Sequence, residues 1–121
     1  MRPLRVDPLV TDVGTAAGHR LVLLSLEVYD EVADLRFARI DVDAPRPLAR
    51  RVPSADAWQV TVDGTPARVL DAVGRGDRAF SNGEVRLAPP PRPGARLVVT
   101  VDLARDEEPL TATVDLPTAS A

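Results

Sequence analysis

The chain has a single histidine, His19, which is the first residue to consider as a general acid or base. A general base needs a nucleophile and an orienting partner within reach, and the sequence offers only Gly18 and Arg20 as immediate neighbours. We therefore expect a histidine at the surface or at the start of a strand. No catalytic residue and no cofactor site are assigned.

Carboxylates occur in three close groups, Asp30-Glu31-Asp34, Asp41-x-Asp43 and Asp106-Glu107-Glu108. None of them matches an EF-hand loop, and Ca²⁺ takes six or more oxygen ligands. Asp41 and Asp43 would lie on one face of a strand with Cα atoms about 7 Å apart, which permits a shared cation. We expect solvated acids in turns and no bound metal. A cation- or carbohydrate-binding sandwich remains the alternative function.

Glycines punctuate residues 71–80, which we expect to form a loop. Gly74-Arg75-Gly76 lacks the third glycine of a dinucleotide fingerprint, and Arg75-Gly76-Asp77 is a tripeptide that integrins read but that recurs by chance. Loops carry binding on sandwich scaffolds. The charged residues Arg75, Asp77 and Arg78 are therefore the candidate contacts with a protein partner.

Composition excludes several classes of function. The 15 basic residues, all arginine, and 18 acidic residues give a net charge of −3, and Arg50-Arg51 is the only adjacent basic pair. Nucleic-acid binding is therefore not expected. The chain has no cysteine and only four aromatic residues. No apolar run approaches the ~20 residues that span a bilayer, so we expect no membrane insertion. If Met1 is the natural start, the absence of a signal-peptide pattern indicates the cytoplasm.

Apolar residues alternate with polar ones in short runs from Val22 to Leu116. This is the pattern of strands with one buried face. It predicts an all-β, two-sheet antiparallel immunoglobulin-like β-sandwich of seven or eight strands over residues 20–117. An extended arm and loop over 1–19 precede it, and a frayed tail over 118–121 follows. The expected core includes Leu24, Leu26, Leu35, Phe37, Val60, Val99, Val101 and Val114.

Residues 21–29 are read as a strand rather than a helix, with Leu24, Leu26 and Val28 inward and Leu23 and Tyr29 outward. The apolar phase then changes near Ala38-Arg39, which predicts a β-bulge there.

Turn residues predict the connections between strands. Asp63-Gly64 and Asn82-Gly83 are both expected to form two-residue hairpins, with a return strand over 65–70 after the first. A short helical turn is expected over 54–57. The proline stretch 89–93 is expected to cross between sheets.

Outward Leu23 and Tyr29 would leave apolar surface exposed. Leu4, Val6 and Leu9 of the N-terminal arm are expected to cover it. The alternative is a homodimer through the arm or through the outer face of residues 21–29.

Three stretches, LVLLSLEVYDEVADLRFARIDV, AWQVTVDG and GARLVVTVDL, resemble small actinobacterial β-sandwich proteins of unknown function. The resemblance implies an immunoglobulin-like fold and a non-catalytic role, and it transfers no functional residues. Together these observations predict a non-enzymatic module that binds an unidentified protein partner through loops or an edge strand.

Overall fold

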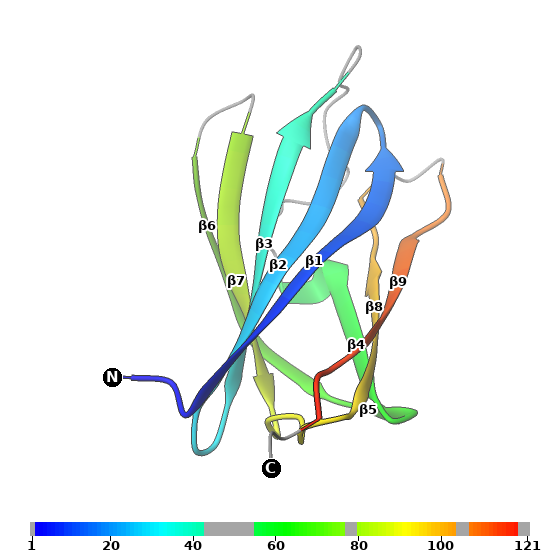
Figure 1. Cartoon of the computed structure of the whole chain (residues 1–121). Helices are drawn as coiled ribbons and strands as arrows, with labels where there is room; N and C mark the ends of the chain where they lie inside the picture. Colours follow the sequence, from blue (N-terminus) through cyan, green and yellow to red (C-terminus); the bar gives the residue numbers. More distant parts are fainter. Residues whose placement is uncertain (1, 43–54, 77–79, 104–106, 119–121) are drawn as a thin grey trace.

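A computed structural model describes residues 2–42, 55–76, 80–103 and 107–118, and it shows two antiparallel sheets around one core (Figure 1). Sheet A has the strand order β1-β2-β3-β7-β6, and sheet B has the order β5-β4-β8-β9. The predicted two-sheet antiparallel sandwich is confirmed. Within the described residues the elements are β1 (Arg5–Ala16), β2 (His19–Val28), β3 (Ala33–Asp41), η1 (Ala55–Ala57), β4 (Trp58–Val62), β5 (Thr65–Pro66), β6 (Arg68–Gly76), β7 (Phe80–Ala88), β8 (Arg96–Val101) and β9 (Leu110–Asp115).

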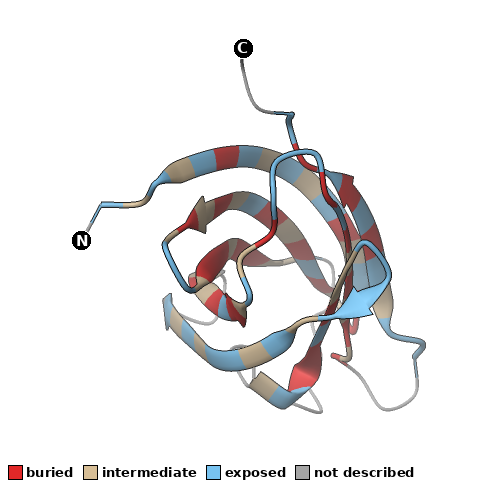
Figure 2. Cartoon of the chain, turned by 90° about the horizontal axis from the view of Figure 1, so that it is seen from below, coloured by how far each residue is buried: buried red, intermediate tan, exposed pale blue. Residues whose placement is uncertain are grey.

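Among the residues whose burial is described, the core is aliphatic apart from one aromatic pair. Phe37 of sheet A and Trp58 of sheet B have ring centroids 4.9 Å apart, so this pair joins the two sheets. Buried residues alternate with more exposed ones along the strands (Figure 2). Each fully buried Val, Leu or Phe side chain contributes about 1.5–3 kcal/mol to folding. The predicted core is confirmed for every residue except Leu24, which is 38% exposed.

Leu24 is exposed because it forms a β-bulge. Leu23 pairs with Phe37 and Ser25 pairs with Arg36, so Leu24 lies between them without a partner residue in β3. An extra residue reverses the alternation of side chains. Leu23 before the bulge and Leu26 after it are therefore both fully buried. The predictions that Leu24 faces inward and Leu23 outward were wrong.

The bulge predicted at Ala38-Arg39 was also wrong. Strand β3 keeps one register with β7, from Ala33 opposite Leu87 to Ile40 opposite Phe80. The apparent change of phase arises because β3 places a charged residue, Arg39, at a buried inward position.

Strand β1 is the edge of sheet A and bends with β2. Pro8 pairs with Ser25 and Thr11 pairs with Leu23. Between these pairs β1 has two residues, Leu9 and Val10, whereas β2 has only Leu24. A second shift leaves Val13 in excess between the pairs Asp12–Val22 and Gly14–Leu21. The path therefore lengthens by one residue from β3 to β2 and by two more from β2 to β1, and these bulges curl the sheet. The upper part of β1 reaches β9, where a Cβ atom at Gly14 would lie 3.2 Å from Leu110. The loop expected through Gly14 is thus strand, and the turn is formed by Ala17 and Gly18.

The hairpin at Asp63-Gly64 is confirmed, since both residues have positive φ, 50° and 84°, as a type I′ turn requires. The return strand divides into β5 and β6, which carry the chain from sheet B to sheet A. Residues 71–76 continue β6, so the loop expected there was wrong for this part.

The second predicted hairpin was wrong, because Asn82 and Gly83 lie in the middle of β7. Gly83 serves close packing instead of a turn. A Cβ atom there would lie 2.0 Å from the Val73 carbonyl oxygen and 3.0 Å from the Phe37 ring. Glycine suits this position because β6 and β3 both approach it closely and leave no space for a Cβ atom.

Candidate protein-interaction surface

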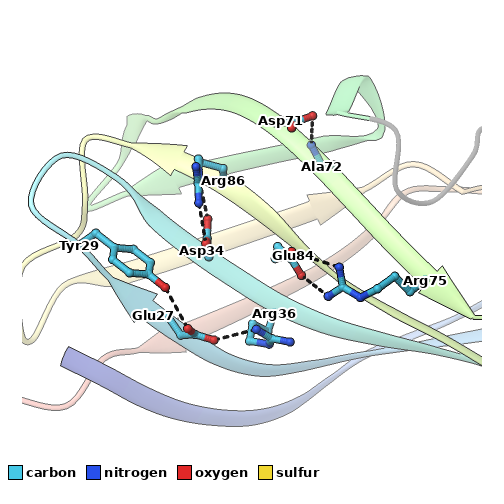
Figure 3. A network of polar contacts seen from close by, with 9 residues as sticks. All are labelled: Glu27, Tyr29, Asp34, Arg36, Asp71, Ala72, Arg75, Glu84 and Arg86. Atoms are coloured by element: carbon cyan, nitrogen blue, oxygen red, sulfur yellow. Dashed lines mark hydrogen bonds and ion pairs between the residues drawn. The ribbon is translucent and has the colours of Figure 1, made fainter. Parts of the chain in front are cut away.

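The outer face of sheet A carries an ordered array of charged side chains across four adjacent strands (Figure 3). We call this array the charged face. It comprises Glu27 of β2, Asp34 and Arg36 of β3, Glu84 and Arg86 of β7, and Asp71 and Arg75 of β6. Alternate strand residues share a face, so the spacing Asp34-x-Arg36 and Glu84-x-Arg86 places each pair on the same side.

Asp34 and Arg86 form the centre of the charged face. Arg86 donates from Nε and Nη2 to the two carboxylate oxygens of Asp34 at 2.8 and 3.0 Å. Asp34 is only 8% exposed, although it lies on the outer face. The hydrogen bonds and charge of Asp34 raise the pKa of the Arg86 guanidinium. This bidentate geometry fixes both side chains.

Glu27 binds two side chains at the β2 side of the charged face. Its carboxylate accepts from Arg36 Nη1 at 2.9 Å and from the Tyr29 hydroxyl at 3.2 Å. Burial raises the pKa of the Tyr29 phenol, and the hydrogen bond and charge of Glu27 raise it further. Tyr29 therefore presents a protonated hydroxyl in a fixed position. It faces outward as predicted.

The β6 side of the charged face contains a hollow of about 140 Å³ lined by Asp34, Asp71, Val73, Glu84 and Arg86. Arg75 donates to Glu84 at 2.8 Å, and Asp71 accepts the Ala72 backbone N–H at 2.9 Å. No arginine within the described ranges pairs with Asp71. Three carboxylates, one guanidinium and the apolar side chain of Val73 thus line the hollow.

The three predicted contact residues are only partly placed by the structure. Arg75 lies on the charged face, in strand β6 rather than in a loop. Asp77 and Arg78 lie outside the described residues. The other members of the charged face were missed, although the alternation of charged residues at every second position of β3 and β7 is a signal that could have identified them.

His19 is the first residue of β2, as the strand-start prediction requires, and it is buried. Its Nδ1 lies 3.1 Å from Asp41 Oδ1 and 2.9 Å from Arg39 Nη1. Arg39 also contacts Asp41 directly and donates from Nε to Ser81 Oγ at 3.0 Å.

Within the described residues, the side chains of this cluster pair buried charged groups with one another. Arg39 and Asp41 meet at one ring nitrogen of His19, and the Ser81 hydroxyl contacts Arg39. Buried charges require such partners because an isolated one is costly to desolvate. The four residues come from three strands, so no spacing within one strand could have indicated the cluster.

Metal ligation has no candidate in the part of the chain that the structure describes, where no three His, Asp or Glu residues gather suitably. Asp41 is committed to Arg39 and His19, and Asp43 lies outside the described residues. Within the same ranges, no helix has the length and apolarity needed to cross a membrane.

Comparison with known proteins adds no assignment to this geometry. No protein-family model matches the chain, and no curated protein or solved structure is significantly similar to it. The resemblance to small actinobacterial sandwich proteins stays a prediction.

Proposed function

We propose that the protein is a non-enzymatic β-sandwich interaction module and that the charged face of sheet A contacts a protein partner. The observation that supports this most directly is the fixed geometry of the face. Arg36, Arg75 and Arg86 are each held by a carboxylate of a neighbouring strand. The side chains are therefore ordered before a partner arrives, which lowers the entropic cost of binding.

Folding stability does not account for this array. Exposed ion pairs contribute about 0–1 kcal/mol each, and burying a carboxylate such as Asp34 carries a desolvation cost. Fixed charges do favour one partner over others, because a mismatched charge at an interface is strongly unfavourable. Recognition is thus a better reason than stability for holding seven charges on one face.

The chemistry that we propose for the partner rests on the hollow on the β6 side. We infer that it receives an arginine or lysine side chain. The aliphatic stem would lie on Val73, which is 42% exposed, and the cationic head would meet Asp71 and Glu84. Arg86 is already paired with Asp34 and Glu84 with Arg75, so within the described residues Asp71 is the carboxylate of the hollow that the incoming cation meets without a paired arginine.

A photo-crosslinking amino acid at Val73, introduced in cells that make this protein, tests the proposal. The matched control places the same group at Thr113, an exposed position on sheet B. We expect a polypeptide of one mass to be trapped at Val73 and not at Thr113, and to be lost when Asp71→Asn and Glu84→Gln are added. Trapping at neither position, or equally at both, would contradict the proposal.

A further inference from the structure

The lower half of β1 is an open apolar edge that points away from β9 (Figure 1). We call residues 4–8 the edge segment. Leu4 and Val6 are 69% and 52% exposed, and Pro8 is exposed. We propose that a second copy of this chain pairs with the edge segment, antiparallel, about a two-fold axis at Val6.

The backbone hydrogen bonds show which groups the edge segment offers. The Val28 carbonyl accepts from Leu4 N–H, and Tyr29 N–H donates to the Val32 carbonyl. Val28 therefore faces β1, and Arg5, its partner in register, faces β2. Since successive residues alternate, the N–H and C=O of Val6 point to the open edge.

Pro8 points the same way as Val6, so the N–H that proline lacks belongs to the open edge rather than to the ladder with β2. At the opposite edge of sheet A, the Ala72 N–H is occupied by Asp71. At the β1 edge, in contrast, the N–H and C=O of Val6 supply the donor and acceptor for pairing.

The edge segment is complementary to itself when the two-fold axis passes at Val6. Its residues read apolar, basic, apolar, acidic, apolar: Leu4, Arg5, Val6, Asp7, Pro8. Antiparallel pairing then places Val6 opposite Val6 of the second copy, where each donates to and accepts from the other. On the inner face Arg5 lies opposite Asp7 of the second copy. Leu4, a bend whose N–H donates to the Val28 carbonyl, lies beyond the paired residues.

Charge favours this register. Arg5 donates to Asp7 of its own chain at 2.9 Å and to the Pro91 carbonyl at 3.0 Å, and Asp7 is only 4% exposed. Pairing therefore places two such Arg5–Asp7 pairs side by side in opposite orientations. Opposite charges directly across a strand pair are favourable, and like charges are unfavourable.

The fold limits this pairing to two chains. Pro8 ends the ladder on one side because it has no N–H, and the bulge at Val10, with φ of 44°, turns the strand away. A two-fold contact uses the same surface on both copies and closes on itself. The pairing leaves the charged face uncovered, so it stands independently of the proposed function.

Light scattering of the full chain at high micromolar concentration tests the inference with two matched variants. Val6→Arg places two guanidinium groups at the axis, whereas Val73→Arg adds the same group beside carboxylates at the opposite edge. We expect twice the chain mass for the wild type and for Val73→Arg. For Val6→Arg we expect a dissociation constant raised by about tenfold or more. A monomeric wild type, or equal behaviour of the two variants, would overturn the inference.

A cross-linking experiment locates the contact independently of mass. The chain has no native cysteine. Val6→Cys and Val73→Cys therefore each introduce a single thiol. Residues directly opposite across paired strands have Cβ atoms about 5 Å apart, close to disulfide range. Mild oxidation should yield covalent dimer for Val6→Cys and little for Val73→Cys. Equal or reversed yields would show that the chains meet elsewhere.

Discussion

Gly83 leaves no room for an added Cβ atom in sheet A. A Cβ atom there would meet backbone, the Val73 carbonyl oxygen at 2.0 Å and Gly74 Cα at 2.9 Å, as well as the Phe37 ring. Backbone atoms of a paired strand cannot move aside without breaking the ladder. Overpacked cores typically lose about 1–3 kcal/mol, and a contact with backbone belongs at or above the upper end.

We predict that Gly83→Ala lowers the free energy of unfolding by about 3 kcal/mol or more, as measured by urea denaturation. Gly64→Ala is the control, because that glycine has positive φ but no atom within 4 Å of its Cβ position. Its conformational cost is about 1 kcal/mol. Equal losses in the two variants would show that crowding at Gly83 is absent.

The ion pair between Asp115 and Arg96 can be tested through the pKa of Asp115. Arg96 Nε donates to its carboxylate at 2.7 Å, and this hydrogen bond and charge lower the pKa of Asp115 below 3.8, its ordinary value. A carboxyl group whose pKa is lower in the folded state stabilises the fold above the unfolded pKa. That contribution is lost as pH falls below about 3.8 toward the folded pKa.

We expect an NMR titration of the Asp115 carboxyl carbon to show a midpoint below 3.8 in the wild type. In Arg96→Gln the midpoint should rise toward that ordinary value. An unchanged midpoint in the variant would mean that the ion pair does not form in solution.

Among the elements, β2 shows what sequence reasoning can and cannot predict. The alternation of apolar residues identified it as a strand, and the same rule predicted the inward residues of β4, β8 and β9 correctly. Side-chain alternation is a local property of one strand, so the sequence contains it. A bulge depends on the register between strands, and the leucines at 23 and 24 are chemically identical candidates for the core.

The charged face was hidden for a related reason. Its ion pairs join residues far apart in the chain, such as Asp34 with Arg86, and they depend on the order β2-β3-β7-β6. Strand order is not contained in the pattern of any one strand. The expected loop failed similarly over residues 71–76, because pairing with β7 holds Gly74 and Gly76 in a strand despite their conformational freedom.

The bulge in β2 makes a sharp prediction about three leucines. Leu23→Ala and Leu26→Ala should each cost about 2–5 kcal/mol in unfolding free energy, since both side chains are fully buried. Leu24→Ala should cost less than about 1 kcal/mol, because its side chain is 38% exposed. Chemical denaturation measures all three. A larger loss of unfolding free energy at Leu24 than at Leu23 would contradict the bulge and would indicate that side chains alternate without interruption along β2.

At the scale of the whole molecule, sheet A presents two distinct surfaces. The β1 edge is apolar and self-complementary, and the outer face of β2, β3, β7 and β6 is charged and ordered. The first suits a second copy of the chain, and the second suits a partner with basic side chains. A dimer paired through β1 would therefore carry two copies of the charged face.

Calorimetric titration of the polypeptide trapped at Val73 measures whether the charged face recognises a protein partner. Asp71→Asn combined with Glu84→Gln removes two charges at nearly constant shape, and Asp115→Asn removes one from sheet B. We predict that the double variant binds about tenfold more weakly or worse, and that the difference shrinks as salt screens the charges. Asp115→Asn should bind as the wild type does. Equal affinity of the double variant and the wild type would contradict the account.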